Sequence, residues 1–166
     1  MGLANSYLKR CARKGLVKVQ QAPANRYLYY LTPRGFAEKS RLTAQYLSYS
    51  LRFYAKASAS CDEVMEQFVA ANVEEFGVRG SSELGEIAIL RARARGLEVG
   101  EVVDPACAGS SLGGHTVVAQ NSDALPVEHW LVTDLRSPQS TYDELCDSFG
   151  PESVFVPSIL GLRLRT

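Results

Sequence analysis

The charges of this chain are divided unevenly between its two parts. Residues 1–58 carry 11 Lys and Arg and a single acid, Glu38, which gives a net charge of +10. Residues 59–166 carry 7 Arg and 17 Asp and Glu, which gives a net charge of −10. A reversal of this size inside one chain indicates two units with different partners. The basic part suits a polyanion, whereas the acidic part is a poor surface for nucleic acid.

The sequence argues against several classes of protein. It has no run of about 18 apolar residues, so we expect no membrane-spanning helix, and its N-terminus lacks the pattern of a secretion signal. The four cysteines, Cys11, Cys61, Cys107 and Cys146, form no C-x-x-C pair, which argues against a zinc or redox site. We expect free, buried thiols in a reducing cytosol, and therefore a cytoplasmic protein.

The basic part begins with a pattern typical of DNA-binding units. Residues 3–14 are predicted to form a helix that ends at Gly15, and residues 16–20 and 26–31 are predicted to form a β-hairpin. A polar, basic helix followed by a hairpin is the second half of a winged helix, in which the helix enters the major groove and the hairpin lies on the DNA backbone. The alternative is a solvated basic face on a small α+β unit.

Two faces of the predicted helix follow from its residue types. The inner face is expected to hold the apolar residues Leu3, Tyr7, Leu8 and Cys11. The residues expected to contact DNA, from the helix and the hairpin, are Asn5, Ser6, Lys9, Arg10, Arg13, Lys14, Lys18 and Arg26.

The next helix is predicted to begin at Thr32-Pro33, with threonine as N-cap and proline in the first turn, and to run to about residue 57. Its apolar residues form two stripes at 3–4 spacing, and a helix that is apolar on two faces must be covered on both. We therefore expect a homodimer through the helix of residues 33–57. The alternative is a helix enclosed within its own chain. The apolar and aromatic members of the two stripes are Phe36, Leu47 and Tyr54, and Leu42, Tyr46, Tyr49 and Phe53.

A capping-box pattern, Ser60-Cys61-Asp62-Glu63, predicts that a separate helix begins near residue 60. Its inward residues are expected to be Val64, Met65, Phe68 and Val69. The predicted domains are therefore residues 1–57, a partial winged helix with a dimerisation helix, residues 58–74, a helical connector, and residues 75–166.

Beyond residue 75, short apolar strands alternate with helices. This alternation predicts a parallel sheet built from β–α–β units. The fold class is therefore α/β: a partial winged helix, long linker helices and a Rossmann-like parallel-sheet domain. The predicted strands are residues 76–78, 97–103, 117–118, 129–133 and 154–156, and the predicted helices are residues 82–95 and 139–149.

A glycine-containing turn, Gly80 to Gly85, follows the first of these strands and opens a helix, which is the setting of a G-x-G-x-x-G phosphate loop. Ser82 replaces the middle glycine, whose absent side chain lets the backbone approach a pyrophosphate. Asp104 ends the second strand, where an acid accepts hydrogen bonds from a ribose. The alternative is a turn that only connects a strand to a helix.

Three stretches of the basic part resemble bacterial winged-helix regulators of the MarR type, most closely the group associated with exopolysaccharide genes. They are residues 3–9 (LANSYLK), 14–19 (KGLVKV) and 29–35 (YYLTPRG), and residues 31–39 are the most specific. The resemblance implies a homodimer that binds double-stranded operator DNA, with the long helix in its interface. In that family further helices precede the recognition helix. We therefore expect an N-terminally truncated copy that binds DNA weakly or not at all.

The acidic part resembles the N-terminal domain of bacterial sugar O-acyltransferases, in the turn at residues 80–85, in Val102-Val103-Asp104 and in the loop at residues 113–118. The resemblance implies a ligand site whose bound molecule is a nucleotide or a sugar nucleotide. With the glycine-turn pattern, it selects the candidate ligand-binding residues Gly80, Ser81, Ser82, Gly85, Asp104 and His115.

No catalytic or metal-binding set is predicted, because the chain has no Ser/His/Asp order, no metal-spaced carboxylates and no Walker A lysine. Of the two histidines, His129 lies in a predicted strand and is expected to be structural. We therefore predict a non-enzymatic DNA-binding regulator whose acidic part senses a metabolite. Two alternatives remain: an enzyme of nucleotide-sugar metabolism with a basic extension, and a ligand-blind oligomerisation module.

Overall fold

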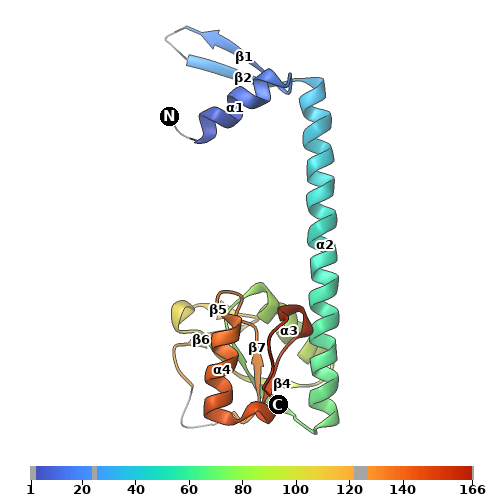
Figure 1. Ribbon diagram of the computed structural model, residues 1–166, viewed down its shortest axis with the longest axis vertical. Helices are drawn as coiled ribbons and strands as arrows, with labels where there is room; N and C mark the ends of the chain where they lie inside the picture. The colour runs from blue at the N-terminus through green and yellow to red at the C-terminus, as the bar shows by residue number, and fades with distance from the viewer. Residues whose placement is uncertain (1–2, 24–25, 122–126, 166) are drawn as a thin grey trace. The chain divides into compact units, whose positions relative to one another are not determined.

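A computed structural model of the chain describes residues 3–23, 26–121 and 127–165 and divides into two compact units, Met1–Arg52 and Phe53–Thr166. We call these unit 1 and unit 2. Their boundary lies inside α2 (Pro33–Ala70), which is one continuous helix (Figure 1). None of the described helices is both long and apolar enough to cross a membrane.

Unit 1 consists of α1 (Leu3–Arg13), the antiparallel strands β1 (Val17–Ala22) and β2 (Arg26–Leu31), and the first part of α2. Gly15 ends α1 with a φ of +68°, a conformation that glycine adopts without a Cβ penalty. Thr32 is the N-cap of α2, as predicted, because its Oγ1 accepts a hydrogen bond from the Gly35 N–H at 3.0 Å. The helix and hairpin predicted from the sequence are therefore present.

Unit 1 has almost no interior. Of residues 4–23 and 26–52, only Gly35 is buried. It is buried because the first turn of α2 packs directly on the Leu16 carbonyl, where a Cβ on Gly35 would overlap. The prediction that Tyr7 faces inward is wrong: Tyr7 is 64% exposed, while Leu8 and Cys11 are half-buried. About 50 residues without a buried side-chain core are not expected to be stable alone.

The expected break in the long helix near residue 60 is also wrong, since α2 continues to Ala70. The capping-box residues make tertiary contacts instead. Ser60 Oγ accepts a hydrogen bond from the Ile159 N–H at 3.0 Å, and Asp62 pairs with Arg91 and Arg95 at 2.6 and 2.5 Å. The part of α2 expected to be a connector is therefore a packed element of unit 2.

Unit 2 is built around a six-stranded mixed sheet with the order β5-β6-β4-β3-β7-β8. All neighbouring pairs are parallel except β5 with β6. The predicted alternation of strands and helices is confirmed, and the antiparallel strand β5 is the element that the sequence did not reveal. The elements are β3 (Glu75–Arg79), α3 (Glu83–Ala94), β4 (Glu98–Val103), β5 (Ser111–Leu112), β6 (His115–Val118), β7 (Trp130–Val132), α4 (Pro138–Phe149) and β8 (Val154–Phe155), with 3₁₀ turns η1 (Pro105–Cys107), η2 (Pro151–Ser153) and η3 (Ser158–Leu160).

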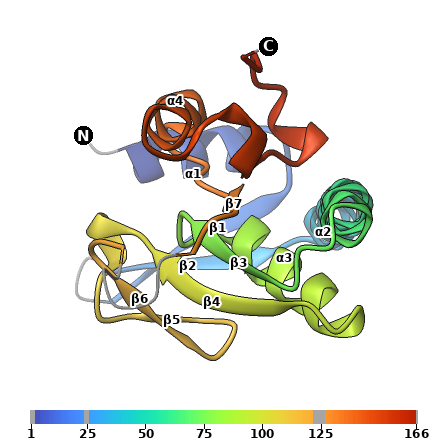
Figure 2. The same cartoon turned by 90° about the horizontal axis from the view of Figure 1, so that it is seen from below.

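Helices cover both faces of this sheet, α3 and the end of α2 on one side and α4 on the other (Figure 2). Along β4 and β7 the side chains alternate between the two faces, so that Val102 and Leu131 belong to the first core while Val103 and Trp130 belong to the second. Gly77 of β3 lacks a side chain because the Trp130 ring lies where its Cβ would be. A sheet buried on both faces is typical of parallel α/β architecture.

The four cysteines are free thiols in the structure. Cys61 and Cys146 are buried as expected, whereas Cys11 and Cys107 are half-buried, so the expectation of four buried thiols is only partly correct. Burial raises the pKa of Cys61 to about 12. Because the thiolate is the reactive form, Cys61 is a packing residue rather than a nucleophile.

Candidate functional site

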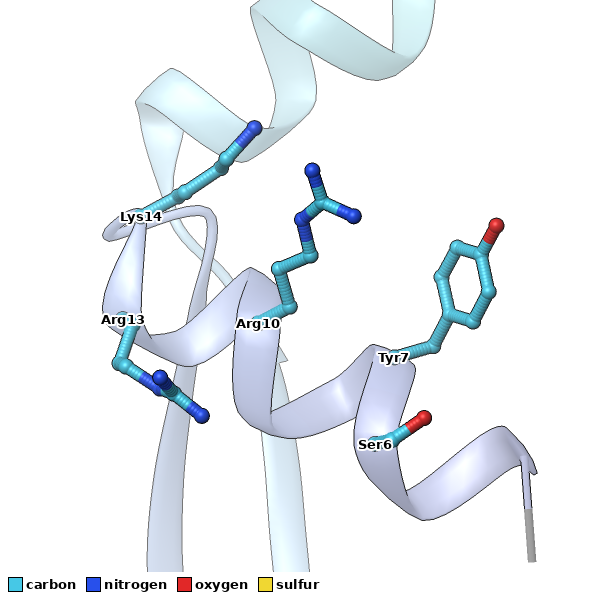
Figure 3. Close-up of a pocket in the computed structure, with 5 residues that line it drawn as sticks. All are labelled: Ser6, Tyr7, Arg10, Arg13 and Lys14. Carbon is cyan, nitrogen blue, oxygen red and sulfur yellow. The ribbon is translucent and has the colours of Figure 1, made fainter.

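The first candidate site is the exposed polar face of α1. Every residue predicted to contact DNA is exposed: Asn5, Ser6, Lys9, Arg10 and Arg13 on α1, Lys14 in the turn after it, Lys18 on β1 and Arg26 on β2. Five side chains line an open hollow of about 500 Å³, and three of them, Arg10, Arg13 and Lys14, are cationic. In Figure 3, Arg10 and Lys14 extend to one side of α1 while Arg13 extends to the other. The helix therefore presents positive charge over more than one side.

Little in unit 1 neutralises this charge. Among its described residues one ion pair is present, Arg41 with Glu38 at 2.8 Å. The hydrogen bond from Arg41 lowers the pKa of Glu38, so this carboxylate stays ionised and already has its own partner. The cations of α1 are thus left facing solvent, which is the arrangement that a polyanion would neutralise.

The second candidate site is a pocket of about 330 Å³ at the carboxyl ends of the parallel strands of unit 2. Gly80 follows β3, Asp104 follows β4 and Asp134 lies just beyond β7, and all three line it. From β3 the chain adds β4 and β6 on one side of the sheet and then returns to add β7 and β8 on the other side of β3, so the strand order reverses between β3 and β7. Crevices at such a switch point are the usual ligand sites of open parallel sheets. The other lining residues are Arg79, Val103, Pro105, Ala106, Arg136, Ser137, Thr141 and Glu144.

Asp104 is the most enclosed charge in this pocket, with only 2% of its surface exposed. Its carboxylate accepts hydrogen bonds from the backbone N–H groups of Ser81 and Ala106 at 2.9 and 3.0 Å. Arg136 Nη2 reaches both of its oxygens, at 2.7 and 2.5 Å. Burial alone would raise the pKa of Asp104, but Arg136 and the two N–H groups together hold it below its usual value.

Asp134 holds the loop that carries this arginine. Its carboxylate accepts hydrogen bonds from the Arg136 N–H at 3.0 Å, the Ser137 N–H at 3.2 Å and the Thr141 hydroxyl at 2.9 Å. These contacts outweigh the effect of burial and lower its pKa. The Arg136 side chain remains 55% exposed. The pocket therefore combines a rigid, buried carboxylate with an arginine anchored at its backbone and open to solvent at its head group.

The glycine turn does not form an open phosphate cradle. The Ser81 N–H donates to Asp104, and the Gly85 N–H donates to Ser82 Oγ at 3.3 Å. Ser82 Oγ in turn donates to the Thr133 carbonyl at 2.6 Å, so the residue in the middle glycine position caps α3. Gly80, with a φ of +108°, packs against the Asp134 backbone. Of the four residues predicted in this turn, Gly80 alone lines the pocket.

His115 does not belong to this pocket. It begins β6, whereas the pocket lies where the parallel strands end, and His115 is not among its lining residues. Its Nε2 lies 3.5 Å from Arg93 Nη2 beside the β5–β6 turn. Burial and the Arg93 charge lower the pKa of His115. The structure therefore brings together Gly80 and Asp104, with Ser81 attached through its backbone, and separates His115 from them.

Sequence reasoning missed Arg136, Asp134 and Arg79. A signal was present, because Asp134 directly follows the predicted strand at residues 129–133. Carboxyl ends of neighbouring parallel strands share one sheet edge, so the residues after this strand belong with Asp104. The order of the strands, which the sequence does not state, is needed to know that the two ends are close. No group of three or more potential metal ligands occurs among residues 3–23, 26–121 and 127–165.

Comparison with protein-family models, with curated proteins and with solved structures gave no match to this chain.

Proposed function

We propose that this protein is a DNA-binding transcription regulator in which unit 1 contacts DNA and unit 2 binds a nucleotide or a sugar nucleotide. The observation that carries the proposal is that two chemically different candidate sites lie in different units. Exposed cations lie along α1 and the hairpin of unit 1. A pocket that contains the buried acid Asp104, at the position where an acid accepts hydrogen bonds from a ribose, lies in the acidic unit 2. A metabolite that favours one dimer geometry would shift DNA affinity by linkage.

The strand order supports a Rossmann-like description of unit 2. Without β5, the five parallel strands lie in the sheet in the order β6-β4-β3-β7-β8. If these strands are numbered as they follow one another in the chain, the order is 3-2-1-4-5. That is the arrangement of dinucleotide-binding folds, with the pocket at its switch point. The helix, tight glycine turn and hairpin of unit 1 likewise support the partial winged helix.

Duplex DNA tests the role of α1 directly. We expect weak association of the full chain with DNA at about 50 mM salt that falls steeply as salt is raised. An Arg10→Gln, Arg13→Gln double variant should reduce the slope of log Kobs against log salt by about two, because each phosphate contact contributes about 0.9. Fluorescence anisotropy with a labelled duplex measures both quantities.

The control for that titration is Arg52→Gln, an exposed cation of unit 1 that belongs to α2 and not to α1 or the hairpin. Loss of binding in the double variant with little change in the control supports the role of α1. Equal slopes in all three proteins would contradict it. Tight, sequence-specific binding by the unmodified chain would contradict the expected weakness.

The exposed faces of α2 support a homodimer. Tyr46 and Tyr49 are 75% and 65% exposed, so no other part of unit 1 covers them, as the alternative of a helix enclosed within its own chain would require. Burying such aromatic area is worth about 25 cal/mol per Å². We expect a dimer by light scattering on a sizing column, and a Tyr46→Glu, Tyr49→Glu variant should be monomeric. A Lys56→Glu control should remain dimeric, and a monomeric unmodified chain would rule the dimer out.

A further inference from the structure

We propose that Arg136 is the phosphate-binding side chain of the unit 2 pocket, and that it leaves Asp104 for the phosphate when a nucleotide binds. The inference rests on the proposed ligand-binding function of unit 2 and adds the ligand class, a phosphorylated ribose, and the residue that selects it. The glycine turn does not present its Ser81 and Gly85 N–H groups to a phosphate, because both already donate hydrogen bonds.

The groups that hold phosphate in a glycine-rich loop are backbone N–H groups, and here two of those in the turn already have partners. The Ser81 N–H donates to Asp104 at 2.9 Å, and the Gly85 N–H donates to Ser82. Of the turn, only Gly80 lines the pocket, and its N–H donates to the Val103 carbonyl, so a phosphate in the pocket would be held by side chains. The two cations that line the pocket are Arg79 and Arg136.

The surroundings of the two arginines distinguish them. Arg79 has a side-chain exposure of 21% and lies 3.6 Å from Glu144, whereas Arg136 is 55% exposed. The Arg136 backbone is fixed through Asp134, so its head group can move while its position in the pocket is kept. Planar guanidinium groups bind phosphate and carboxylate through the same paired geometry, so either partner fits.

Asp104 can lose this arginine without becoming an unsatisfied buried charge. The N–H groups of Ser81 and Ala106 still hydrogen bond to its carboxylate. The site that Arg136 leaves is then open to ribose hydroxyls, which donate hydrogen bonds to such an acid. Arg136 thus blocks the ribose site until a phosphate draws it away. The acids Asp134 and Glu144 also face the pocket, and this makes an arginine necessary for an anionic ligand.

The exchange predicts effects of opposite sign on two ligands. In an Arg136→Gln variant, UDP and ADP should bind about tenfold to a hundredfold more weakly, because a charged hydrogen-bond pair to phosphate is lost. Uridine and adenosine should bind about threefold or more tightly, because they no longer compete with Arg136 for Asp104. Calorimetric titration of the full chain measures both, with Arg163→Gln, an exposed arginine outside the pocket, as control.

Each outcome decides the question. Opposite shifts for nucleotides and nucleosides support the exchange. Parallel shifts, or no shift, in a variant whose Trp130 fluorescence remains native would overturn it while leaving ligand binding intact. If none of the four compounds binds the unmodified chain, both the exchange and the ligand-binding half of the proposed function fail. Inorganic pyrophosphate that binds as tightly as UDP would show that the ribose makes no contribution and would also overturn the exchange.

Discussion

Replacing Phe68 by alanine is expected to destabilise unit 2 by about 3–5 kcal/mol, the usual cost of emptying a large aromatic site in a core. Phe68 is fully buried, and its ring centroid lies 4.5 Å from that of Phe76 and 4.4 Å from that of Phe155. The change removes both ring contacts and leaves a cavity between α2 and the sheet. Urea unfolding followed by the fluorescence of Trp130, the one tryptophan of the chain, measures the loss in unit 2.

The neighbouring residue provides the control. Val69 was predicted to face inward but is 55% exposed, so Val69→Ala should change the free energy of unfolding by about 0.5 kcal/mol or less. If both variants lost only about 0.5 kcal/mol of the free energy of unfolding or less, this part of α2 would be only a connector. A large loss in Phe68→Ala alone would show that it is a core element of unit 2.

Replacing Gly80 by alanine should destabilise unit 2 by about 3 kcal/mol or more, from two costs that add. The φ of +108° disfavours any residue with a Cβ, by about 1–2 kcal/mol. The new Cβ would also overlap the Asp134 backbone, where the Cα lies 2.5 Å away. Because that contact joins the ends of β3 and β7, relief requires the floor of the pocket to move, which costs about 1–3 kcal/mol more.

Gly96 separates the two costs. It has a φ of +73° but no atom within 4 Å of a Cβ built on it. Gly96→Ala should therefore lose only the conformational part, about 1–2 kcal/mol. Both variants are measured by urea unfolding with Trp130 fluorescence. Equal losses at the two positions would show that the packing of Gly80 on the Asp134 backbone contributes nothing.

Individual residues show how much of the fold could be predicted from the sequence. Local signals were sufficient for most elements: Gly15 and Thr32 marked helix ends, and the alternation after residue 75 gave the strands and helices of unit 2 close to their observed bounds. These features depend on a few neighbouring residues, so they can be recognised without the fold. The capping-box pattern at Ser60 failed because the same polar side chains serve tertiary contacts instead, to Ile159 and from Asp62 to two arginines.

Only part of the candidate pocket could be predicted, namely the residues that a local pattern identifies. Gly80 and Asp104 each follow a strand and were found from their own surroundings. Arg136 became part of the site only because β7 lies beside β3, an adjacency between residues more than 50 positions apart. His115 was placed there by resemblance and lies elsewhere, because the pocket gathers strand ends while His115 begins its strand.

The sequence by itself determined the division of charge, a basic unit before an acidic one, since net charge depends on composition alone. It also determined the α/β character of the second unit, because hydrophobic periodicity records which faces are buried. The tertiary structure decided that α2 is one helix, that the Ser81 N–H donates to Asp104, and that Arg136 pairs with this buried acid. Those three features depend on long-range packing and hydrogen bonds, which no local pattern of residues encodes.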